Sequence, residues 1–77
     1  MKQTKYYIHL YDYENGMAVF ESDFFETEQE ALDFAKRCNF SVSQDVNVEL
    51  MSADFYEEEC EYTYFNRSLE PFEYGRI

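Results

Sequence analysis

The residues of this chain that could do chemistry are one histidine, two cysteines and a large excess of carboxylates. No local motif fixes a serine or cysteine nucleophile near His9. The 17 Asp and Glu residues are a general feature of the chain rather than a chosen catalytic pair. Two of them could stand at the spacing of a glycosidase pair, but nothing in the sequence selects which two. The sequence therefore predicts a protein that is not an enzyme.

Metal-binding patterns are incomplete. Asp12 to Gly16, with Asp23 in the twelfth position, is similar to an EF-hand loop, but the glycine comes one residue early and a strand is expected to follow. His9, Cys38 and Cys60 lack the close C-x-x-C or H-x-x-x-H spacing of zinc sites. We therefore expect no metal and no cofactor.

The placement of the acids is the most informative feature of the sequence. The formal charge is −11, with 17 acids against 6 Lys and Arg. Eight acids lie between Lys5 and Lys36 and seven more between Arg37 and Arg67, with no Lys or Arg inside either stretch. This charge disfavours direct binding to nucleic acid or to an anionic membrane and favours a basic protein surface as the partner.

The elements that must position these acids form one small domain. The chain has 77 residues, of which 45% are hydrophobic, including 8 Phe and 8 Tyr. Alternating apolar residues predict four strands, and a capping box at Thr27 to Glu30 predicts a helix. The expected strands cover about 5–13, 17–25, 45–51 and 57–65, the helix about 28–38, a turn 52–56, and an irregular tail 66–77 pinned by Phe72 or Tyr74. The β-β-α-β-β order predicts an α+β domain whose single helix packs on one face of an antiparallel sheet.

The first predicted hairpin has a definite register. A three-residue loop, Glu14 to Gly16, with a left-handed Gly16 in a bulge keeps carboxylates off the apolar face. This loop pairs Leu10 with Phe20, Ile8 with Ser22 and Tyr6 with Phe24. The face that the helix leaves open is then expected to carry Tyr7, His9, Tyr11, Tyr13, Val19, Glu21 and Asp23.

The fourth predicted strand begins with a row of acids. Glu57, Glu59 and Glu61 would project from one face at steps of about 6.6 Å, because each strand residue rises ~3.3 Å. Neighbouring carboxylates at this distance repel by about 0.6 kcal/mol in bulk water. A function that needs negative potential is one reason to keep such a row, whose step is similar to that of successive phosphates.

A resemblance follows from these features. The small size, the acid excess and the acids from Asp54 to Glu61 with interleaved Tyr56, Tyr62 and Tyr64 resemble the small acidic inhibitors of phages and mobile elements. These include anti-CRISPR and anti-restriction proteins that act as nucleic-acid mimics. The resemblance is one of type and composition and carries over no functional residues. It implies an inhibitor that occupies the basic nucleic-acid-binding groove of a defence nuclease or similar enzyme.

The predicted partner-binding residues combine acids of both hairpins with tyrosines of the open face. They are Asp54, Glu57, Glu58, Glu59, Glu61, Asp12, Glu14, Glu21, Asp23, Tyr7, Tyr11 and Tyr13. The alternative is a small interaction or adaptor module that forms a homodimer, or binds a basic partner, through its tyrosine-rich sheet face.

The beginning of the chain carries no recognisable export or membrane signal. The apolar run from Tyr6 to Tyr11 is short and contains His9, which does not fit a signal peptide or a membrane span. We therefore expect a cytoplasmic protein, located in the host cytoplasm if a phage encodes it. In that compartment Cys38 and Cys60 are expected to be reduced and partly buried.

Overall fold

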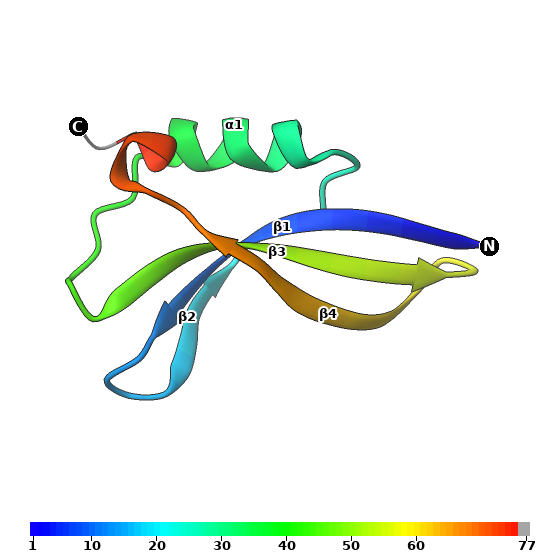
Figure 1. Cartoon of the computed structure of the whole chain (residues 1–77), viewed down its shortest axis with the longest axis horizontal. Coiled ribbons are helices and arrows are strands. Elements are labelled where there is room, and N and C mark those ends of the chain that lie inside the picture. The colour runs from blue at the N-terminus through cyan, green and yellow to red at the C-terminus, as the bar shows by residue number, and fades with distance from the viewer. Residues whose placement is uncertain (76–77) are drawn as a thin grey trace.

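The computed structural model describes residues 1–75, and residues 76 and 77 of the predicted tail lie outside the described part. Its elements are β1 (Lys2–Asp12), β2 (Met17–Glu21), α1 (Glu28–Cys38), β3 (Val46–Tyr56), β4 (Glu59–Ser68) and a short 3-10 helix, η1 (Pro71–Tyr74). The strands form one antiparallel sheet in the order β2-β1-β3-β4, and α1 and η1 lie on the same side of it (Figure 1). The predicted α+β class with its β-β-α-β-β order is confirmed.

Helix α1 begins and ends where its sequence signals indicate. The Thr27 hydroxyl accepts a hydrogen bond from the Glu30 amide at 3.1 Å, and the Glu30 carboxylate accepts one from the Thr27 amide at 3.1 Å. Asn39 ends the helix in the left-handed conformation, with φ at 50°. The fully buried Ala31 and Ala35 allow the helix to pack close to the sheet.

The apolar core lies between this helix, η1 and the two inner strands. The β1–β3 register sets Ile8 opposite Leu50 and Leu10 opposite Val48, so all four side chains point to the helix side. The chain end closes this core with Leu69 and Tyr74. Tyr74 rather than Phe72 therefore pins the tail, because Phe72 is 67% exposed.

The first hairpin confirms the central predicted pairing and corrects its ends. Leu10 lies opposite Phe20, and Gly16 is left-handed with φ at 66°, as predicted. The loop has four residues, 13–16, and a bulge beside Leu10 absorbs the extra one.

The predicted second strand also ends early, at Glu21. The Ser22 hydroxyl, rather than a backbone carbonyl, accepts a hydrogen bond from the Ile8 amide at 2.8 Å. From there Tyr6 pairs with Phe25 instead of the predicted Phe24.

The second hairpin turns later than predicted. Residues 52–56 belong to β3 rather than to a turn, and the turn consists of Glu57 and Glu58. Ser52 and Asp54 look like turn residues in the sequence, but both are buried in the strand. Strand β4 continues to Ser68, three residues into the segment predicted as an irregular tail.

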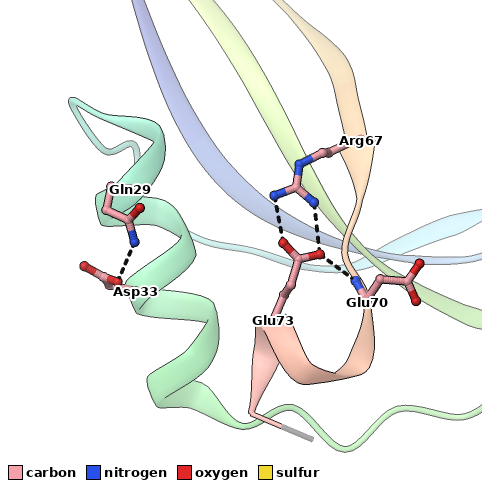
Figure 2. A network of polar contacts seen from close by, with 5 residues as sticks. All are labelled: Gln29, Asp33, Arg67, Glu70 and Glu73. Carbon is pink, nitrogen blue, oxygen red and sulfur yellow. Dashed lines mark hydrogen bonds and ion pairs between the residues drawn. The ribbon is translucent and has the colours of Figure 1, made fainter.

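An ion pair fastens η1 to the end of β4. The two terminal nitrogens of Arg67 donate to the two carboxylate oxygens of Glu73 at 2.9 and 2.7 Å, and Glu73 also accepts from the Glu70 amide at 2.9 Å (Figure 2). The Arg67 hydrogen bond is the main cause that lowers the pKa of Glu73. The pair therefore stabilises the fold at neutral pH, and this contribution is lost as the pH falls through the lowered pKa. The Arg67 cation is thus already neutralised within the chain.

Gly75 ends η1 where a larger residue does not fit. Its φ is +88°, and a Cβ there would lie 2.8 Å from Asn39 Oδ1 and 2.9 Å from the Lys36 carbonyl oxygen. We expect Gly75→Ala to lower the free energy of unfolding by about 2–4 kcal/mol in urea titrations. Gly16→Ala is the matched control, because its φ is also positive but its Cβ would meet only Tyr11 Oη at 4.0 Å. Equal losses in both variants would show that the close packing at Gly75 contributes nothing.

Candidate protein-binding site

The site begins with a mismatch in length between the helix and the strands. Both α1 and β3 contain 11 residues. The helix is about 16 Å long and the strand about 36 Å, because the rise per residue is ~1.5 Å in a helix and ~3.3 Å in a strand. The β3–β4 turn therefore projects beyond the helix (Figure 1). We call this projecting end the acidic hairpin, formed by Tyr56, Glu57, Glu58, Glu59, Glu61 and Tyr62.

The turn of the acidic hairpin has an unfavourable sequence for its backbone conformation. Tyr56 lies opposite Glu59, which leaves Glu57 and Glu58 as the two residues of the loop, with φ at 51° and 74°. Positive φ at both positions is typical of the type I′ turn, in which Asn-Gly is preferred. A residue other than glycine costs roughly 1–2 kcal/mol in the left-handed conformation.

Among residues 1–75, no cation forms an ion pair with the glutamates of this hairpin. Within residues 1–75 ion pairs join Lys5 to Glu26 and Arg67 to Glu73, and His9 Nδ1 lies 3.3 Å from a carboxylate oxygen of Glu49. All four hairpin glutamates are exposed, and none takes part in these pairs. Lys2 lies opposite Tyr56 on β1, yet no ion pair links it to the hairpin.

The predicted straight row of three glutamates is wrong. Glu57 lies in the turn rather than in the strand, so it does not align with Glu59 and Glu61. The β3–β4 register also shifts, because Cys60 pairs with Phe55 but Tyr62 pairs with Asp54. Glu61 is the extra residue of this bulge. The charges therefore form a cluster around the tip of the hairpin.

Asp54, predicted to bind a partner, is instead part of the sheet's internal structure. It is 5% exposed and accepts hydrogen bonds from Thr4 Oγ1 at 3.0 Å and Tyr64 Oη at 3.3 Å. These bonds link β1, β3 and β4 where the helix no longer covers them. Asp54 is therefore removed from the candidate binding residues.

The turn acids of the first hairpin, Asp12 and Glu14, lie far from the acidic hairpin. The first turn follows Asp12, whereas the second turn is next to Lys2 in the register, about 33 Å away along β1. Asp12 itself organises its loop, because its carboxylate accepts from Asn15 Nδ2 at 2.6 Å and from the Glu14 amide at 2.9 Å. The Asn15 side chain is the main cause that lowers the pKa of Asp12. Glu14 is exposed in the same distant turn, whereas the exposed Glu21 and Asp23 lie nearer the middle of the sheet, where the neighbouring Phe24 contacts Phe55.

The predicted tyrosine face lies opposite α1, but it is largely occupied by its own contacts. Ring contacts with centroid distances of 4.8–6.2 Å link Phe55, Phe24, Tyr7, His9, Tyr11 and Tyr13 in that order. Tyr7 is only 4% exposed, and this burial is the main cause that raises its pKa. Tyr7 therefore offers little surface to a partner. Tyr11 is half-buried and Tyr13 is exposed.

A buried carboxylate that sequence reasoning missed lies beneath this face. Glu49 is 3% exposed and accepts a hydrogen bond from Tyr13 Oη at 2.6 Å, which is the main cause that raises the pKa of Tyr13. His9 Nδ1 lies 3.3 Å from the other carboxylate oxygen, an electrostatic contact rather than a well-aligned hydrogen bond. The β1–β3 register sets His9 opposite Glu49, and no local sequence signal gives that register.

The two cysteine thiols lie apart from each other on the surface. Cys38 and Cys60 are free, but both are exposed rather than partly buried, because Cys38 lies in the last turn of α1 and Cys60 in the edge strand. In the described part of the chain, no group of three or more His, Cys, Asp and Glu is arranged to hold a metal ion. No helix within residues 1–75 is long and apolar enough to cross a membrane.

Comparison with known proteins adds no relative: no family model, curated protein or solved structure matches this chain.

The double substitution Glu57→Asn/Glu58→Gly tests whether the turn is held at a cost to stability. We expect it to raise the free energy of unfolding by about 1–3 kcal/mol, because it relieves the backbone and removes two like charges. Urea titration measures this change. Glu28→Gln/Asp45→Asn removes the same charge at exposed positions outside the hairpin and is expected to leave the free energy of unfolding unchanged or to lower it by about 1 kcal/mol or less, because Glu28 lies in the first turn of α1. A loss of stability in the hairpin variant would mean that the two glutamates are structurally required.

Proposed function

We propose that this chain is an acidic protein-binding inhibitor that occupies the basic nucleic-acid-binding groove of a defence nuclease or a similar enzyme. The observation that carries this proposal is the Glu57-Glu58 turn, which keeps carboxylates where Asn and Gly are more stable. Glu59 and Glu61 add two further charges that form no ion pair with a cation of the described part of the chain. Residues retained at a cost to stability are expected where they serve binding.

The side chains of the acidic hairpin suit an arginine-rich surface. A carboxylate accepts two parallel hydrogen bonds from a guanidinium group, and an aromatic ring packs against its face. Tyr56 and Tyr62 are 37% and 60% exposed and border a shallow hollow with Glu61. Grooves that hold nucleic-acid phosphates are lined with the Arg and Lys side chains that such a surface attracts.

The shape of the hairpin supports insertion into a groove rather than a copy of the phosphate backbone. Its charges cluster at the tip instead of following a regular line, because of the turn at Glu57-Glu58 and the bulge at Glu61. The tip projects beyond the helix, so a concave partner can surround it (Figure 1). We therefore favour a mode of binding in which the negatively charged tip of the acidic hairpin fills the groove and excludes the nucleic acid.

The alternative of a homodimer through the tyrosine face has weaker support. Tyr7 is buried within its own chain, and the Tyr13 hydroxyl is engaged by Glu49. Each copy also carries a formal charge of −11, which opposes self-association.

Competition for a nuclease tests the proposed function. The chain is immobilised to capture candidate basic nucleases, and each captured enzyme is titrated in a gel-shift assay with its labelled DNA or guide RNA. We expect the chain to displace the nucleic acid, and the apparent affinity to fall with added salt. A ternary complex that contains enzyme, nucleic acid and this chain would contradict occupation of the groove.

Two variants locate the contact in the same assay. Glu57→Asn/Glu58→Gly is expected to weaken displacement by about tenfold or more, although it folds more stably. Glu28→Gln/Asp45→Asn removes the same charge elsewhere and is expected to stay within about twofold of the original chain. Equal weakening by both variants would show that only the net charge matters.

A further inference from the structure

Strand β4 is an edge of the sheet, and the hydrogen-bond pattern shows which of its backbone groups are unpaired. On β1, the backbone groups of Tyr6 bond to Phe25 and those of Ile8 bond to Ser22. The N–H and C=O groups of these even-numbered residues therefore point towards the β2 side of the sheet. In an antiparallel sheet the N–H and C=O groups of successive residues point to opposite sides of the strand. The backbone groups of the odd-numbered residues of β1 therefore bond to β3. The backbone groups of the even-numbered residues of β3 then point towards β4. The hydrogen bond from the Leu69 amide to the Val48 carbonyl at 2.8 Å confirms this direction.

The same alternation identifies the outward groups of β4. Tyr62 lies opposite Asp54 and Tyr64 lies opposite Ser52, so the backbone groups of both tyrosines bond to β3. The N–H and C=O groups of Thr63 and Phe65 therefore point away from the sheet. Residues 62–65 are the regular part of this edge, because the register shifts on either side of them.

Bulges interrupt this edge on either side of residues 62–65, but the regular part between them carries no group that blocks pairing with another strand. Lysine, proline and a covering loop commonly block exposed edges. Strand β4 contains neither lysine nor proline, and its regular part carries three exposed rings, Tyr62, Tyr64 and Phe65. Its acids, Glu59 and Glu61, lie towards the hairpin tip and repel an acidic strand while they attract a basic one.

Charge complementarity also argues against a second copy as the occupant. The only cation of β4 is Arg67, and Glu73 already holds it through two hydrogen bonds (Figure 2). A second β4 would therefore bring no free cation to Glu59 and Glu61. A partner segment with Lys or Arg would supply it.

We infer that β4 takes up an extended basic segment of a partner protein as a fifth strand, which pairs with the outward backbone groups of Thr63 and Phe65. Lys or Arg side chains of that segment then meet Glu59 and Glu61. Strand addition of this kind draws its affinity from main-chain hydrogen bonds and its specificity from the flanking side chains. The inference rests on the proposed function and specifies the form in which the basic partner is bound.

The test uses a synthetic peptide of about ten residues that alternates Arg with Val and Thr, titrated into the ¹⁵N-labelled chain. With the chain saturated, we expect hydrogen exchange of the Thr63 and Phe65 amides to slow by about tenfold or more, because these amides become hydrogen-bonded. Unchanged exchange at both amides in the saturated complex would overturn strand pairing. Failure of the peptide to bind would overturn it as well.

Two substitutions at Thr63 distinguish the contribution of its backbone N–H to peptide binding from that of its side chain. Thr63→Pro removes the outward N–H and the hydroxyl that interacts with Tyr7, whereas Thr63→Val removes only the hydroxyl. We expect peptide affinity to fall by about tenfold or more in the proline variant and by less than about twofold in the valine variant. If Thr63→Pro does not fold, an N-methylated Phe65 introduced by chemical synthesis removes the neighbouring outward N–H instead.

Other outcomes distinguish this inference from the proposed function. Equal affinities in the proline and valine variants, with binding still weakened by Glu57→Asn/Glu58→Gly, would overturn strand addition and leave the acidic hairpin as the contact. A dimer of the chain alone in sedimentation, abolished by Thr63→Pro, would overturn the basic partner as occupant. Displacement of nucleic acid from a nuclease is read separately and tests the proposed function alone.

Discussion

The structure depends on one constraint: a single helix of 11 residues is the main cover for a four-stranded sheet whose inner strands are more than twice as long. The helix completes an apolar core over Ile8, Leu10, Val48 and Leu50 and reaches no further. The rest of the sheet must satisfy its buried groups by other means. Tyr7 and Phe24 shield the opposite face, and Asp54 links three strands beyond the helix end. The acidic hairpin is the part for which no such cover exists.

The carboxylates of this chain differ in whether the fold supplies them with hydrogen-bond donors. Where the sheet buries an acid, it supplies donors: Tyr13 for Glu49, and Thr4 with Tyr64 for Asp54. Glu73 likewise receives both nitrogens of Arg67. The hairpin glutamates receive none of these, although the fold is able to provide them elsewhere. The exposed Glu14, Glu21, Asp23 and Asp45 also have no ion pair within residues 1–75, so what distinguishes the hairpin tip is its density of exposed acids, four among residues 57–61.

Local signals in the sequence predicted the fold, and non-local pairing determined most of the site. The capping box of Thr27 with Glu30 and the pairing of Leu10 with Phe20 depend on residues close in the chain, and both are confirmed. Glu-Glu is not a turn signal, so the sequence predicts the second turn too early, at polar residues that the sheet buries. The pairing of His9 with Glu49 depends on a register between distant strands, which no short pattern encodes.

We expect repulsion among the exposed acids to exceed attraction in the folded state, most strongly at the acidic hairpin. The most direct measurement is the melting temperature at neutral pH from low salt to about 0.5 M NaCl, for the original chain and for Glu57→Asn/Glu58→Gly. Salt screens exposed charges, so the melting temperature of the original chain should rise, and the rise should be smaller in the variant. A melting temperature that stays constant or falls with salt would show that the acids are structurally paired and would contradict a negative surface retained for binding.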